Sequence, residues 1–279
     1  MCFLAYNMSF LKIWLRVIDF LRKGLYNQFV NHLIFGGVLS VNKIRVTIFN
    51  ENMHDKTERI LEVYPNGMHG AIKECLDADG RFETTIALQD MPEHGLTDEV
   101  LNNTDVLFWW GHMMHHEVDD AVVQKVYDRV IDGMGLVVLH SGHYSKIFKK
   151  LLGTGCDLKW RETGDLERIW VLKPSHPIAA GLDEYFELPH EETYGEHFAI
   201  PTPDDLVFMS WFSGGEVFRS GCCYERGNGK IFYFRPGHES FPTFYDANIR
   251  KVLVNSALWA ATDCGKKQTY GHWLPDYNK

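Results

Sequence analysis

The stretch GLVVLHSGHYSKIFKKLL, residues 135–152, passes from β-forming residues through a sharp turn into a helix-forming segment. A strand that ends in H-S-G-H and turns directly into a helix exposes the residue at the turn beside free backbone N–H donors. His140 and His143 occupy this turn, and we expect both to carry function. The competing interpretation is that His140 is a core histidine bonded to a carbonyl group.

Strand-forming and helix-forming segments alternate on both sides of this stretch. Strands separated by helices imply right-handed crossovers and a mostly parallel sheet covered on both faces. The sequence therefore predicts a doubly wound α/β fold. Gly pairs between short strands at 213–234 predict appended antiparallel hairpins. Strands are expected at residues 43–50, 81–88, 104–110, 135–140, 167–173, 205–212 and 229–234, and helices at 64–78, 117–133, 145–152 and 246–261.

Composition and charge narrow the function. The chain has 279 residues, 45% of them hydrophobic, which is enough for one large α/β domain. Its formal net charge of -9 is spread without a basic stripe, which argues against a nucleic-acid partner. The six cysteines show no C-x-x-C spacing, which predicts reduced thiols and a cytoplasmic location.

The first 42 residues differ from the rest of the chain. Their apolar residues fall at roughly helical spacing, but charged residues interrupt every window long enough to cross a bilayer. We expect residues 1–42 to be an N-terminal extension outside the core, with an amphipathic membrane-surface anchor as the alternative. The functional domain is predicted at 43–263, followed by a tail at 264–279.

Histidines follow three of the expected strands. They occur in WWGHMMHHEV (109–118), VVLHSGHYSK (137–146) and YFRPGHESFP (233–242). Ligands of open α/β sheets bind beyond the carboxyl ends of the strands. We therefore expect the three segments to bring their histidines to one rim of the sheet.

The rim predicts a metal site. His112 and His115 are three residues apart and can share an ion, although a solvated helix start would also explain the segment. Three or four neutral imidazoles suit zinc or a similar cation that keeps an open position. The expected ligands are His112, His115, His143 and His238.

Acid and base groups are expected beside the ion. LPHEETYGEHF (188–198) reads as a loop, which is either a charged surface or a cover over the rim. In the second case Glu192 or His140 is the base, and Tyr194 donates to the oxyanion that develops on a sugar or keto-sugar. Arg235 and Glu239, beside the Pro-Gly turn, complete the expected catalytic set.

Several of these motifs together resemble one protein family. They are the strand ending LHSGH, the E-E-x-Y segment, FYFRPGH and the closing helix with ALWAA, and they resemble the ThuA family of trehalose utilization proteins over roughly Lys43 to Ala261. The resemblance implies a flavodoxin-like, class I glutamine amidotransferase-like fold. It also implies a role in the uptake and catabolism of trehalose or related disaccharides, with a link to the oxidation of glycosides to 3-keto sugars.

Departures from the amidotransferase pattern limit the chemistry. His140 stands where those enzymes carry a thiol, so glutaminase activity is not expected. Ser141, with His238 and Glu239, is an alternative hydrolase nucleophile. No G-x-G-x-x-G follows the first strand, so a sugar dehydrogenase partner would supply any nicotinamide. The second class of function is therefore a non-catalytic sugar-binding partner of such a dehydrogenase, and a homo-oligomer is compatible with either.

Overall fold

The computed structural model describes residues 42–261. The expected extension at 1–42, apart from Asn42, and the expected tail at 264–279 lie outside the described residues. Within residues 42–261, no helix is long and apolar enough to cross a membrane.

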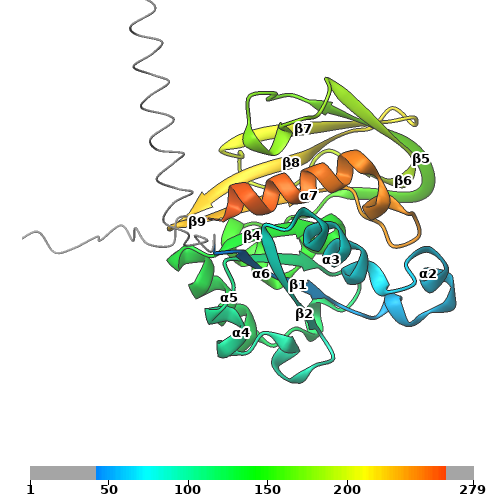
Figure 1. Cartoon of the computed structure of the whole chain (residues 1–279). Helices are drawn as coiled ribbons and strands as arrows, with labels where there is room; N and C mark the ends of the chain where they lie inside the picture. Colours follow the sequence, from blue (N-terminus) through cyan, green and yellow to red (C-terminus); the bar gives the residue numbers. More distant parts are fainter. Residues whose placement is uncertain (1–41, 262–279) are drawn as a thin grey trace, which may run out of the picture. The chain divides into compact units, whose positions relative to one another are not determined.

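A nine-stranded sheet in the order β2-β1-β3-β4-β9-β8-β7-β5-β6 organises the described residues (Figure 1). The first five strands in this order pair in parallel, and the rest pair antiparallel. The α/β class is confirmed, and the antiparallel part is larger than the expected hairpins. The strands are β1 (Ile44–Asn50), β2 (Phe82–Leu88), β3 (Val106–Trp110), β4 (Gly135–Leu139), β5 (Lys159–Val171), β6 (Tyr185–Gly195), β7 (Asp205–Phe212), β8 (Val217–Arg226) and β9 (Gly229–Phe234).

Helices cover both faces of the parallel half. Apolar residues of α3 and α7 join one core cluster, and those of α5 and α6 join the other. Ser145 and Asp246 cap α6 and α7, because their side chains accept hydrogen bonds from first-turn N–H groups. The helices are α2 (Glu58–Val63), α3 (Gly67–Asp79), α4 (Asp98–Asn102), α5 (Asp120–Asp132), α6 (Lys146–Leu152) and α7 (Ala247–Ala260).

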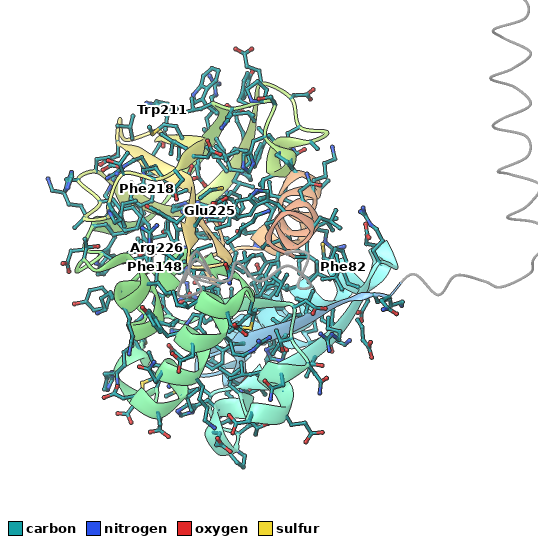
Figure 2. The ribbon with its side chains drawn as sticks, turned by 90° about the vertical axis from the view of Figure 1, so that its left-hand side faces the viewer. Phe82, Phe148, Trp211, Phe218, Glu225 and Arg226 are labelled. Carbon is teal, nitrogen blue, oxygen red and sulfur yellow. The ribbon has the colours of Figure 1, made fainter. Side chains whose placement is uncertain are left out.

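The core has two layers because side chains alternate across each buried strand. Trp109 belongs to one cluster, where its ring stacks on Phe49 at 4.0 Å, and Trp110 belongs to the other. Phe82 and Phe148 belong to the two different clusters and lie on opposite sides of the ribbon in Figure 2. Both faces of the parallel strands are therefore committed to packing, and their side chains that are available for chemistry lie at the strand ends.

The order of the parallel strands places a crevice at their carboxyl ends. β1 lies between β2 and β3, so the chain moves outward in one direction to β2 and in the other to β3, β4 and β9. This is the flavodoxin-like order with its switch point between β1 and β3, where open α/β sheets bind ligands. The expected flavodoxin-like arrangement is confirmed.

The segment 188–198 was expected to be a loop, and this prediction is wrong for residues 188–195, which lie in a strand. Residues 185–195 form β6, which pairs antiparallel with β5. The segment looks like a loop because it carries adjacent acids, and carboxylates are almost never fully buried unless they are paired. Glu191 is fully buried in β6, with Arg235 as its partner.

Candidate metal site at the carboxyl ends of the strands

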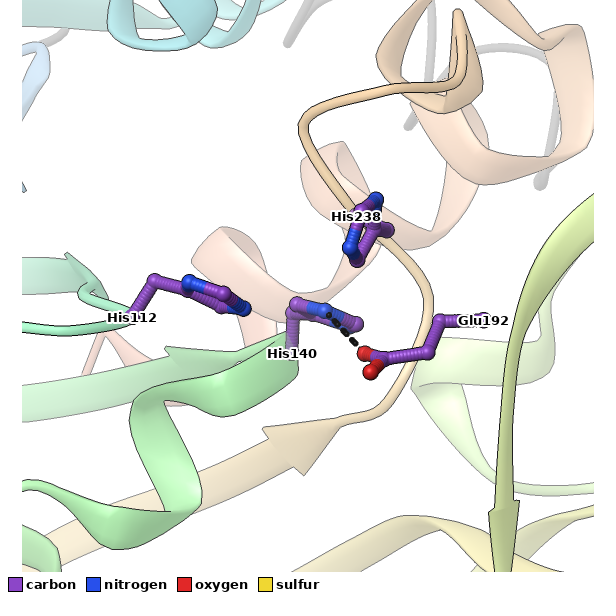
Figure 3. A group of neighbouring side chains, drawn as sticks. All are labelled: His112, His140, Glu192 and His238. Carbon is purple, nitrogen blue, oxygen red and sulfur yellow. Dashed lines mark ion pairs between the residues drawn. The ribbon is translucent and has the colours of Figure 1, made fainter. Parts of the chain in front are cut away.

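Four distant segments bring three imidazoles and one carboxylate together (Figure 3). His112 follows β3, His140 follows β4, His238 follows β9, and Glu192 lies within β6. Each offers one ligand atom, and these atoms all lie within 4.8 Å of one another. The expectation that three strand ends share one rim is confirmed.

His140 is held with one ring nitrogen free. It is fully buried at the end of β4, with a φ of 50°, the left-handed conformation typical of a sharp strand-to-helix turn. Its Nδ1 lies 2.9 Å from the Arg235 carbonyl oxygen, which can only accept, so Nδ1 carries the proton and Nε2 carries a lone pair. The interpretation of His140 as a carbonyl-bonded histidine is therefore correct for one nitrogen and leaves the other for the site.

The free nitrogen faces a second acceptor. His140 Nε2 lies 3.1 Å from Glu192 Oε2, the contact marked by the dashed line in Figure 3. Among the described residues, neither atom has a hydrogen-bond partner, although both are buried. Two buried acceptor atoms at this separation repel each other unless a cation or a proton lies between them.

Burial sets the charge states in this group. It raises the pKa of Glu192, against the opposing effects of His112 and Arg235. It lowers the pKa of His140 well below its ordinary value and, together with the neighbouring His140 and His112, lowers the pKa of His238 to about 2. Both imidazoles are therefore neutral near pH 7, the form in which histidine binds a metal.

Arg235 lies beneath the site and does not line it. The sequence placed it in the catalytic set, but its side chain is fully buried between Glu167 and Glu191. Its Nη1 also donates to the Glu192 carbonyl oxygen at 2.6 Å. Arg235, which directly follows β9, therefore connects this end of the sheet to β6 and positions Glu192.

Of the two adjacent acids, Glu192 faces the site. The Glu191 carboxylate is already occupied, because it accepts hydrogen bonds from Arg235, Gly237 and Thr243. Glu192 lines the cavity and Glu191 does not.

A cavity of about 740 Å3 lies over these groups, within the usual size range of small-molecule sites. Tyr194 and Glu239, both expected in the catalytic set, line it. The exposed side chains of Met113, Tyr144 and Trp160 also line it. The cavity therefore joins a polar, mostly buried floor to exposed apolar surface.

Two of the four expected ligands lie outside the close group. His143 Nδ1 donates to the Cys156 carbonyl oxygen at 2.8 Å, and its ring packs against Tyr194. His115 packs against Tyr144, with 6.1 Å between ring centroids. Both line the cavity, but His140 and Glu192 occupy the two places in the four-atom group that were expected for these histidines.

The geometry of Ser141 does not favour a nucleophile. Its hydroxyl donates to the Gly111 carbonyl oxygen at 2.7 Å. A serine nucleophile must instead hydrogen-bond to a base. Nε2 of the expected base, His238, and Oε1 of its orienting group, Glu239, are 3.7 Å apart, which is beyond hydrogen-bond reach.

Sequence reasoning missed two residues that follow β1. The Glu51 carboxylate accepts from the backbone N–H groups of His112, Met113 and Met114, at 2.7, 2.9 and 2.8 Å. His54 Nε2 lies 3.1 Å from His112 Nδ1. Their signal was present, because ENMHD (51–55) follows the first strand and reaches the same rim as the other three segments.

Comparisons with known proteins agree with this fold. A family model described as ThuA, trehalose utilisation, matches residues 45–260. A protein from Parabacteroides merdae described as ThuA-like has a TM-score of 0.60 at 17% identity, over 83% of this chain and 93% of that one. A second, from Bacteroides uniformis, has a TM-score of 0.59 at 16% identity, over 81% and 94%. A cytoplasmic protein from Salmonella typhimurium has a TM-score of 0.52 at 13% identity, over 78% and 99%. No curated protein sequence matches this chain significantly.

Proposed function

Since the chain belongs to the ThuA family of trehalose utilisation, we propose that it is a metal-dependent enzyme acting on a sugar or keto-sugar. One observation carries the proposal. His140 Nε2 and Glu192 Oε2 face each other, buried and without hydrogen-bond partners among the described residues, beside two further imidazoles. A divalent cation would satisfy all four groups at once.

The donor set favours zinc or a similar borderline cation. Three imidazoles and a carboxylate match the nitrogen and oxygen ligands of zinc sites. Ligand atoms of a tetrahedral zinc site lie roughly 3.3 Å apart, given bond lengths of about 2.0–2.1 Å. The His140–Glu192 separation of 3.1 Å fits this value, whereas other pairs in the group extend toward 4.8 Å, so binding requires some inward rotation of the outer side chains.

The residues around the group have the properties needed for carbonyl chemistry. A bound cation of this type polarises a carbonyl or hydroxyl oxygen of the sugar. Glu192 would help to hold the cation, and its carboxylate is also the group placed to accept a proton from the substrate. Tyr194 stacks on His140 at 5.2 Å, and burial raises its pKa well above the ordinary value, so its phenol stays protonated and can donate.

The proposal also includes a cellular location and a partner protein. The described cysteines are all free thiols, and one similar structure is described as a cytoplasmic protein, so we place the enzyme in the cytoplasm. Without a dinucleotide fingerprint after the first strand, a separate sugar dehydrogenase would supply the keto-sugar.

Removal of the ion tests this function. We expect each molecule of the purified protein to contain one metal ion, bound by His112, His140, Glu192 and His238. Chelation should remove it and reduce consumption of a keto derivative of trehalose to background, and zinc should restore both. Elemental analysis and a sugar assay measure the two effects, and circular dichroism checks that the apo-protein stays folded. A metal-free protein that binds trehalose normally would contradict the proposal and support the non-catalytic sugar-binding alternative.

Trp160 tests whether the cavity binds a sugar ring. Its side chain is 65% exposed and lines the cavity, so it can cover an apolar face of a pyranose. Burying roughly 50 Å2 of apolar surface contributes about 1.3 kcal/mol, so Trp160→Ala should weaken trehalose binding about tenfold. Trp211→Ala is the matched control, because Trp211 is also partly exposed but does not line the cavity. Isothermal titration that shows equal affinities for the two variants would remove Trp160 from the sugar site.

A further inference from the structure

His54 and Glu239 lie directly behind His112, and the proposed reaction uses neither. His54 Nε2 is 3.1 Å from His112 Nδ1, and His54 Nδ1 is 3.4 Å from Glu239 Oε1. The two imidazole rings meet nearly at right angles, with centroids 4.8 Å apart. The three side chains therefore form a line from a carboxylate, through one imidazole, to a residue of the proposed metal site.

Hydrogen-bond directions along this line are determined by chemistry. A neutral imidazole has one N–H and one lone pair. If His112 binds the ion through Nε2, its proton must be on Nδ1, which then donates to His54 Nε2. The proton of His54 is consequently on Nδ1, where it faces the Glu239 carboxylate, a group that can only accept.

We propose that Glu239 and His54 are positioning residues that fix the tautomer and ring orientation of His112, so that its Nε2 is available to the ion. The inference rests on the proposed metal-dependent function. Metal-binding histidines commonly donate their second N–H to a carboxylate, which orients the ring and increases its basicity. Here an intervening imidazole relays that effect.

The residues around His112 support the idea that Glu239 and His54 orient its ring. Glu51 already holds the backbone of the His112 loop through three N–H groups, but these bonds leave the rotation of the ring unset. Among residues 42–261, the contact with His54 is the one hydrogen bond that the His112 ring makes. Glu239 is almost fully buried, where a carboxylate acts more strongly on the neighbouring His54 ring than it would in water.

A second ion is the competing explanation, because His54, His112 and Glu239 also have ligand atoms within 4.8 Å of one another. Such an ion would take the lone pair of His112 Nδ1 while the first ion takes that of Nε2. His112 would then have to lose both ring protons. In the arrangement without a second ion, His54 and His112 both keep their ordinary neutral form with one ring proton each. We therefore favour that arrangement.

Titration of the full-length protein with Co2+ tests the inference, since Co2+ has a visible spectrum that Zn2+ lacks. His54→Leu removes the hydrogen bond to His112 Nδ1 and the contact with the Glu239 carboxylate. We expect Co2+ affinity to fall about 10–100-fold with a shifted visible band. His54→Gln supplies a carboxamide oxygen that can accept from His112 Nδ1, and it should restore most of the affinity and the band. Glu239→Gln should give an intermediate loss. His116→Leu, on the same loop but with its side chain 70% exposed, is the control and should match the wild type.

The outcomes separate the inference from the proposed function. Wild-type protein that binds no Co2+ would overturn the proposed function and the inference with it. Wild-type protein that binds one Co2+, with His54→Leu binding it equally well and with the same spectrum, would overturn the inference alone. Two ions in the wild type and one in His54→Leu would also overturn it, because His54 would then be a ligand. Thermal unfolding without metal checks that each variant is folded.

Discussion

Replacement of Arg235 by methionine is expected to destabilise the protein by about 3–5 kcal/mol, a large part of the stability of a typical domain. The Arg235 guanidinium is fully buried between the carboxylates of Glu167 and Glu191, which are also fully buried. Methionine fills a similar volume but leaves these two acids without their cation. Urea unfolding followed by circular dichroism measures the loss.

Two comparisons isolate the buried pairing as the cause. Arg219→Met removes an arginine that pairs with Glu196 where both side chains are partly exposed, and it should cost about 1 kcal/mol or less. Adding Glu167→Gln and Glu191→Gln to Arg235→Met removes the stranded charges and should recover part of the stability. Equal losses for Arg235→Met and Arg219→Met would contradict the structural role assigned to Arg235.

His140→Asn is expected to abolish most ion binding while leaving the fold intact. Asparagine tolerates the left-handed backbone at this position and can keep a donor for the Arg235 carbonyl oxygen. It lacks the atom equivalent to Nε2. Four-ligand zinc sites bind with about 10–16 kcal/mol, so loss of one ligand should cost roughly 3 kcal/mol, about a hundredfold to a thousandfold in affinity.

His143→Asn is the matched comparison for this variant. His143 is also buried and also donates from Nδ1 to a carbonyl oxygen, that of Cys156, but it lies outside the four-residue group. It should therefore retain zinc with an affinity close to that of the wild type, as a metal-binding titration of both variants would show. If His143→Asn loses the ion and His140→Asn keeps it, the ligand set is the one expected from the sequence and not the one inferred from the structure.

The convergence of histidines could be predicted because it depends only on strand direction. Parallel strands place their carboxyl ends at one edge, so three segments that each follow such a strand must meet there. The same rule applied to β1 would have added Glu51 and His54. They were missed because the segment after β1 was considered only as a place for a dinucleotide fingerprint.

The strand that carries Glu192 could not be predicted in this way. The sequence brings Glu192 to the rim only if a charged loop folds over it, whereas the structure places it in β6, where the adjacent Glu191 is buried against Arg235, 44 residues further along the chain. Which histidines act as metal ligands also depends on the direction in which each side chain points. His140 and His143 share one turn, yet only His140 Nε2 faces the other ligands, because each ring is oriented by a different backbone carbonyl.

The triple hydrogen bond of Glu51 has a further consequence for recognition. A loop that carries a ligand-binding group usually loses conformational freedom when the ligand arrives, and this lowers the affinity. With one carboxylate accepting from three successive backbone N–H groups, the His112 loop is already ordered by folding. The rim is thus preorganised on the side of β1 and β3. Any adjustment to the ligand is then expected in the exposed side chains that line the cavity, Met113, Tyr144 and Trp160.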